Sequence, residues 1–142
     1  MLKKILVAFD GSDPSRHAFS YALHLVRRCV PCVPEIHVVA VAQLPEPADI
    51  VEIDAIIDTA RGHYTTLFKE LAAEAAAMDL AISTEVVVGH PADQIIRYAR
   101  EHAIDMIFAG QTGKSKIESW LMGSVSRRIV THAHCTVTIV KQ

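Results

Sequence analysis

The residues best suited to chemistry in this sequence are small ones near its C-terminus. Gly110 and Gly113 stand three positions apart, and nine residues separate Gly113 from the pair Gly123 and Ser124. Glycines at this spacing let the backbone turn sharply and approach a ligand closely, because no Cβ is in the way. If Gly123 and Ser124 open a helix, its free N–H groups favour an anion. The pattern therefore predicts a phosphate-binding site. Further groups that could add hydrogen bonds or charge are Ser126, Lys114 and Lys116.

Two other interpretations of this loop have to be weighed. Taken singly, each glycine could make a tight turn, and Ser124 could cap a helix. The complete spacing, placed between a strand and a helix, favours the phosphate site. Gly113, Lys114 and Ser115 also imitate the end of a P-loop. A P-loop needs a glycine five residues before Gly113, and that residue is Phe108, so this motif is excluded.

Three charged side chains near this loop have two interpretations each. Asp10 directly follows an apolar run, and its carboxylate could accept hydrogen bonds from ribose hydroxyls or serve as a turn or cap residue. We expect the ligand role, since ligands of parallel sheets bind beyond the strand ends. Arg127 and Arg128 could reach phosphates, but they stand one turn into the predicted helix and are expected to face solvent.

Apolar runs and helical patterns alternate along the chain. Strands are expected at residues 5–9, 36–42, 82–88, 105–109 and 136–140, and helices from Pro14, over residues 53–75, from Pro91 and from Gly123. Such alternation is typical of an α/β protein whose parallel sheet carries helices on both faces. Residues 111–122 are expected to form a polar loop. No boundary or repeat is visible, so one three-layer domain is expected over residues 1–142.

The predicted topology indicates where a ligand would bind. Open parallel sheets bind ligands beyond the carboxyl ends of their strands, at the point where the strand order reverses. In a five-stranded sheet of this kind, that point lies between the first and fourth strands. Residues 10–12 and the loop that begins at Gly110 follow those two strands. Asp10 and the glycine pattern are therefore expected to lie together.

The composition disfavours several classes of partner. The 142 residues carry 14 basic and 16 acidic side chains, for a formal charge of -2. So balanced a surface gives no long-range attraction to nucleic acid or to an anionic membrane. No run approaches the roughly 20 apolar residues that span a bilayer. Asp10 interrupts the first apolar run too early for a signal peptide, so we expect a cytoplasmic protein.

Cysteine and histidine side chains could bind metal or respond to redox state and pH. Cys29 and Cys32 form a Cys-x-x-Cys pair, but it follows a helix rather than opening one, and no second pair accompanies it. We expect a reduced structural pair. The eight histidines are scattered and are expected on the solvated surface, although metal binding or pH sensing is considered for two on the first predicted helix and two near the last predicted strand. These are His17, His24, His132 and His134.

The sequence resembles the universal stress protein family over essentially its whole length. That family's signature, Gly-x2-Gly-x9-Gly followed by Ser or Thr, is met by Gly110, Gly113, Gly123 and Ser124. The opening KKILVAFDGS and the tail GSVSRRIVTHAHCTVTIVK also resemble the family's first strand and its closing helix and strand. The resemblance implies a five-stranded sheet in the order 3-2-1-4-5, the fold called adenine-nucleotide alpha-hydrolase-like.

The resemblance also implies a ligand and a mode of assembly. The ligand would be ATP, or ADP or AMP with the same adenosine contacts, with Mg²⁺ held through the phosphates. Ribose would lie near Asp10 and Gly110, and adenine near Val41. The nucleotide-binding residues implied are Ala8, Phe9, Asp10, Val41, Ala109, Gly110, Thr112, Gly113, Lys114, Gly123, Ser124, Val125 and Ser126. A homodimer would form through the last strand, at Thr136, Val137, Thr138, Ile139 and Val140.

Two departures from the family pattern stand out. Thr136 occupies a position where the family commonly has proline. The nine-residue spacer ends in an apolar stretch that could pack on the nucleotide, on a partner or over the site, at Trp120, Leu121 and Met122. Neither departure removes a proposed phosphate contact.

The function expected from these observations is nucleotide binding without efficient catalysis. The protein would bind ATP and act as a stress-response signalling module through its dimer and partners. A slow ATP hydrolase or phosphotransferase is the first alternative, since the spacer offers Lys114, Lys116 and Glu118, although in no recognised catalytic arrangement. A nucleotide-independent interaction scaffold is the second. A flavin-binding electron carrier ranks last, because the compact phosphate turn expected of it is absent.

Overall fold

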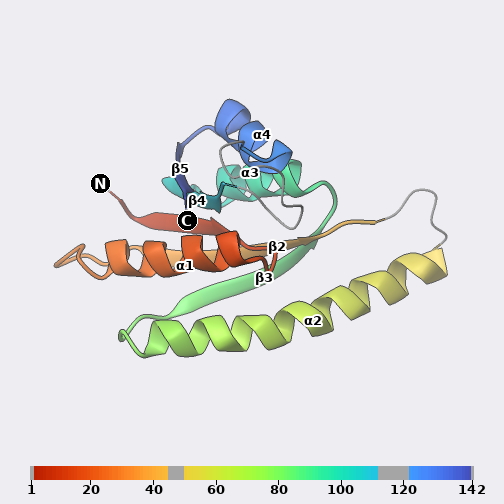
Figure 1. Cartoon of the computed structure of the whole chain (residues 1–142), viewed down its shortest axis with the longest axis horizontal. Helices are drawn as coiled ribbons and strands as arrows, with labels where there is room; N and C mark the ends of the chain where they lie inside the picture. Colours follow the sequence, from red (N-terminus) through yellow and green to blue (C-terminus); the bar gives the residue numbers. More distant parts are fainter. Residues whose placement is uncertain (1, 45–49, 112–121, 142) are drawn as a thin grey trace.

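Figure 1 shows the computed structural model of the chain, which describes residues 2–44, 50–111 and 122–141. Five parallel strands form one sheet in the order β3-β2-β1-β4-β5, which confirms the predicted α/β fold class and strand order. The elements in chain order are β1 (Lys4–Ala8), α1 (Asp13–Val26), β2 (Glu35–Ala42), α2 (Ile50–Ala76), β3 (Ile82–Val88), α3 (Pro91–Glu101), β4 (Met106–Gly110), α4 (Ser124–His132) and β5 (Thr136–Val140).

The sheet separates two apolar cores. Ile5 and Val7 of β1 point to the face covered by α1 and α2, where Phe19 and Phe68 are buried. Leu6, between them, points to the opposite face, which α3 and α4 cover. Figure 1 shows α3 and α4 together on one side of the molecule and α2 on the other. Burial on both faces explains why the central strand has a continuous apolar sequence.

Most predicted element limits hold within a few residues, and those of β3 and β5 hold without change. One detail of α1 was wrong. The helix begins at Asp13 because Ser12 caps it, accepting a hydrogen bond from the Ser15 N–H at 3.3 Å. Pro14 is therefore the second helical residue rather than the first. Residues 112–121 of the predicted polar loop lie outside the described residues.

None of the described helices combines the length and the apolar character that crossing a bilayer would require.

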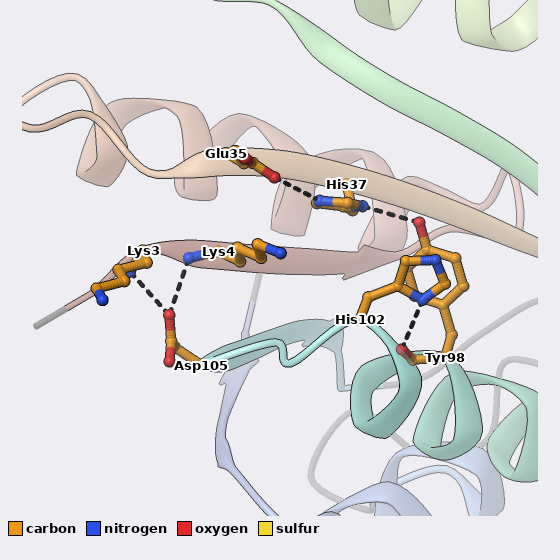
Figure 2. A network of polar contacts seen from close by, with 7 residues as sticks. All are labelled: Lys3, Lys4, Glu35, His37, Tyr98, His102 and Asp105. Carbon is orange, nitrogen blue, oxygen red and sulfur yellow. Dashed lines mark hydrogen bonds and ion pairs between the residues drawn. The ribbon is translucent and has the colours of Figure 1, made fainter.

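The amino ends of the strands carry a polar network that joins β2 to α3 (Figure 2). His37 on β2 is 9% exposed, so the expectation of solvated histidines is wrong for this residue. Its Nε2 lies 3.2 Å from a Glu35 carboxylate oxygen, and its Nδ1 lies 2.8 Å from the Tyr98 hydroxyl. Since a carboxylate only accepts, the Nε2–H of His37 donates to Glu35; in the tautomer that carries its single proton there, Nδ1 accepts a hydrogen bond from the Tyr98 hydroxyl.

The same network fixes the end of α3. His102 stacks on the Tyr98 ring with centroids 3.8 Å apart, and its Nδ1–H donates to the Tyr98 carbonyl at 3.0 Å. Burial, and to a lesser degree the charge of Glu85, raises the pKa of Tyr98. Its hydroxyl therefore stays protonated and can donate a hydrogen bond to His37.

Asp105 joins the start of β4 to the start of β1. One of its carboxylate oxygens accepts the backbone N–H groups of Lys3 and Lys4 at 2.8 and 2.9 Å, as Figure 2 shows. These two hydrogen bonds hold the pKa of Asp105 below the ordinary range of an aspartate.

Asp105→Asn is therefore expected to lower the urea midpoint of unfolding at pH 7, because an amide oxygen is a weaker acceptor than a carboxylate. A depressed folded-state pKa stabilises the fold above the ordinary value of about 3.9. That contribution is lost as the pH falls through the folded-state pKa. Urea unfolding between pH 7 and pH 2.5 should show the wild-type advantage shrinking toward the acid end. An advantage that is equal at both pH values would contradict this account.

Candidate functional site

A cavity of about 410 Å³ opens beyond the carboxyl ends of β1 and β4, where the strand order reverses. Ten of the thirteen sequence-predicted nucleotide-binding residues line it: Ala8, Phe9, Asp10, Val41, Ala109, Gly110, Gly123, Ser124, Val125 and Ser126. The other three, Thr112, Gly113 and Lys114, lie outside the described residues. The fold thus brings two segments a hundred residues apart in sequence to one cavity, at the position expected for an open parallel sheet.

The first turn of α4 faces this cavity. Gly123 is the N-cap, with φ at −64° and ψ at 159°, and it has no side chain to cap the helix. The first intrahelical bond runs from the Arg127 N–H to the Gly123 carbonyl at 2.9 Å. The N–H groups of Ser124, Val125 and Ser126 therefore have no intrahelical acceptor. Together with the positive end of the helix dipole, they form a place where an anion is favoured.

The start of α4 is held in position by the end of β4. The Ser126 hydroxyl donates to the Gly110 carbonyl at 2.7 Å, and the Gly123 N–H donates to the Gln111 carbonyl at 2.8 Å. The Ser126 hydroxyl proton is thus already used, so this side chain positions the helix and offers a ligand only its oxygen lone pairs and its backbone N–H.

Asp10 has the turn role, one of the two roles weighed from the sequence. It lines the cavity, and its Oδ1 accepts hydrogen bonds from both the backbone N–H, at 2.9 Å, and the hydroxyl of Ser12. The Asp10 N–H donates to the Ser15 hydroxyl at 3.3 Å. The carboxylate is therefore fixed by the turn before α1. Within the described part of the chain, no hydrogen bond engages its Oδ2, which leaves an acceptor for a ligand hydroxyl.

Gly110 has a structural reason to be glycine. A Cβ at this position would lie 2.7 Å from the Pro14 Cβ, and 2.8 and 2.9 Å from the carbonyl carbon and oxygen of Pro14. The end of β4 can approach the first turn of α1 only without that atom. This contact accounts for the glycine whether or not a ligand is bound. By contrast, the Gly123 backbone is extended and can be adopted by any residue.

Several lining residues were not predicted from the sequence. Gln43 follows β2, and His90 and Pro91 follow β3, so the rule that selected Asp10 would have found them if applied to every strand end. Tyr64 and Ile95 also line the cavity. They carried no separate signal, because they continue the apolar faces of α2 and α3. The remaining unpredicted lining residues are Ser15, Val39 and Ile129.

Neither arginine of α4 is among the described residues that line the cavity. The Arg128 Nε–H donates to an Asp93 carboxylate oxygen at 2.7 Å, which ties α4 to α3. This hydrogen bond, more than any other neighbour, holds the pKa of Asp93 below its usual range. Arg127 is exposed, as expected. The described residues contain no cluster of three or more His, Cys, Asp or Glu side chains that could hold a metal ion.

Comparisons with known proteins agree with this fold. A sequence family described as the Universal stress protein family matches residues 1–141. A universal stress protein of Methanocaldococcus jannaschii is 32% identical over 145 residues, which cover 100% of this chain and 84% of that protein. The solved structure of UspA from Lactobacillus plantarum superposes with a TM-score of 0.87 at 24% identity, over 98% of this chain and 97% of that one.

Two other solved structures contain ligands. An Arabidopsis thaliana family member with AMP bound superposes with a TM-score of 0.70 at 18% identity, over 99% of this chain and 92% of that one. A universal stress protein in complex with cAMP superposes with a TM-score of 0.68 at 22% identity, over 99% of this chain and 97% of that one. At these identities the likeness is one of fold.

Gly110→Ala is expected to lower the free energy of unfolding by about 1–3 kcal/mol, the usual cost of overpacking, in the absence of any nucleotide. Gly62→Ala is the matched control. A Cβ at Gly62, within helix α2, meets nothing within 4 Å, so this change should stabilise the protein by about 1 kcal/mol. Urea denaturation monitored by circular dichroism measures both. Equal stabilities for the two variants would refute the packing role of Gly110.

Proposed function

The chain belongs to the universal stress protein family, and we propose that it binds an adenine nucleotide in the cavity at the ends of β1 and β4. The observation that carries the proposal is the first turn of α4, where three consecutive N–H groups without intrahelical acceptors face the cavity. A phosphate group satisfies such donors and is stabilised by the helix dipole. An apolar ligand would leave them unpaired.

The rest of the cavity suits a nucleoside. Asp10 stands between the strand ends, and its Oδ2 can accept hydrogen bonds from ribose hydroxyl groups. The lining near β2 is mainly apolar, with Val39 and Val41 beside Ile95, and offers a surface on which adenine can lie. A volume of about 410 Å³ falls in the usual range of small-molecule sites. The ligands of the AMP-bound and cAMP-bound relatives have this chemistry.

We propose ATP as the nucleotide, on the complete spacing from Gly110 to Ser124. Mg²⁺ would then be held through the phosphates. The protein would act in the cytoplasm as a stress-response module whose bound nucleotide alters its dimer or its affinity for partner proteins. Binding rather than turnover is proposed because a hydrolase needs a base positioned on the attacking water. Asp10 is the one carboxylate among the described lining residues, and its Oδ1 is already engaged by Ser12.

Dimerisation through β5 is proposed on the position of that strand. Thr136–Val140 forms one edge of the sheet, and among the described strands only β4 pairs with it, so its outer side could pair with the same strand of a second copy. Sedimentation equilibrium over a range of protein concentrations tests this proposal, and a monomer throughout would oppose it.

Gly123→Asp and Gly123→Asn separate a phosphate site from a merely structural helix start. Asp and Asn are both favoured N-cap residues and suit the extended backbone at Gly123, so α4 should be retained in both variants. Their side chains have nearly the same shape, but only Asp places a negative charge where the phosphates are proposed to lie. Isothermal titration calorimetry should show that Gly123→Asp binds ATP at least tenfold more weakly than Gly123→Asn does. This corresponds to a difference of about 1.4 kcal/mol in binding free energy.

Adenosine serves as the control ligand, because it has no phosphate. Its affinity should differ little between the two variants, while circular dichroism shows that both are folded. If both variants bound ATP as the wild type does, the phosphates would not lie at α4.

A further inference from the structure

Two thiols lie before the amino end of β2, at the end of the sheet opposite the cavity. Cys29 and Cys32 stand in the connection between α1 and β2, separated by Val30 and Pro31, and both are free. A structural role, as expected from the sequence, would place them in an apolar core, because buried free cysteines pack as small apolar side chains. Cys32 is instead exposed, and Cys29 is partly exposed. The packing of the protein does not account for this pair.

The two cysteines stand three positions apart in a connection where the chain reverses direction. Helix α1 and strand β2 run in opposite directions, and the connection between them turns back at one end of the molecule (Figure 1). The backbone bends at Cys29 and again at Pro31. A disulfide needs Cα atoms roughly 4.4–6.8 Å apart. A four-residue segment that bends at its first and third residues can bring its two ends to this separation.

The connection is able to make the movement that this separation requires. Val30 is 80% exposed and Val33 is 48% exposed, so these side chains gain little by staying where they are. The backbone hydrogen bonds of the turn lie in its first half, from the Cys29 N–H to Val26 at 2.9 Å and from the Val30 N–H to Arg28 at 3.0 Å. Among the described residues, no such backbone hydrogen bond is made by the N–H groups of Cys32 or Val33.

The neighbouring charges favour one kind of reaction partner. Arg27 and Arg28 immediately precede Cys29, and both are exposed. Their guanidinium groups attract an anionic small molecule to the thiols. Glutathione disulfide is such a molecule, and it is the oxidant that an exposed dithiol can exchange with.

We propose that Cys29 and Cys32 form a reversible intramolecular disulfide by exchange with a low-molecular-weight disulfide. The exposed Cys32 thiolate attacks one sulfur of glutathione disulfide, the S–S bond breaks, and one glutathione leaves as a thiolate that takes a proton from water. Cys29, as its thiolate, then attacks the Cys32 sulfur of the mixed disulfide and expels the second glutathione. Two protein thiols are oxidised, and one glutathione disulfide is reduced to two glutathione thiols. This site is independent of the proposed nucleotide binding.

Cys135 provides an internal comparison. It is partly buried at the start of β5, and burial raises the pKa of its thiol, so less of it is the reactive thiolate. Of the three cysteines, it is therefore expected to react most slowly.

The experiment is mass spectrometry of the full chain after incubation with glutathione disulfide, acid quenching and alkylation. The mass of the wild type should fall by that of two hydrogen atoms, and peptide mapping should locate the new bond between Cys29 and Cys32. Dithiothreitol should restore the original mass. In Cys29→Ser the thiol that would attack the mixed disulfide is absent, so a glutathione adduct should accumulate on Cys32. The adduct should be at least about tenfold less abundant in the wild type, because ring closure is intramolecular. Circular dichroism checks that the variant is folded.

A Cys135→Ser background should leave the Cys29–Cys32 bond unchanged. The proposal is overturned if the wild type stays reduced, if it accumulates the glutathione adduct as Cys29→Ser does, or if the bond that forms involves Cys135 or a second chain.

Discussion

The site depends on β1 lying at the centre of a parallel sheet, with β2 on one side and β4 on the other. The connection after β1 leads toward β2, whereas the connection after β4 leads toward β5. Where two connections diverge in this way, a space opens between their starting points. Asp10 and Gly110 stand at those starting points. The cavity is thus a consequence of strand order, and the residues around it decide what it can hold.

Contacts among three elements keep this space in shape. The end of β4 lies against Pro14 in the first turn of α1, at a distance that only glycine permits. The Gly110 carbonyl in turn accepts the Ser126 hydroxyl, which holds the start of α4 beside the same strand end. The N–H groups at the start of α4, which have no intrahelical acceptor, are therefore held toward the cavity by contacts within the protein. A site held by such contacts does not have to spend binding energy on ordering itself.

Much of this arrangement could be predicted from the sequence, because strong local patterns determined it. Residues 82–88, closed by Gly89, predicted strand β3, and the glycine spacing predicted where α4 begins. What could not be predicted depended on contacts between distant segments. Tyr64 and Ile95 resemble core residues of their own helices until the fold brings them to the cavity. The reason for Gly110 lies in Pro14, nearly a hundred residues away, and the partners of His37 lie on its own strand and on α3.

Nucleotide content of the purified protein tests the central claim most directly. The protein is denatured, and the released small molecules are identified and quantified by liquid chromatography; protein that releases none is titrated with MgATP. The account predicts an adenine nucleotide near one per chain, either released or bound on titration. Protein that is folded, releases no nucleotide and binds neither ATP, ADP nor AMP would contradict it.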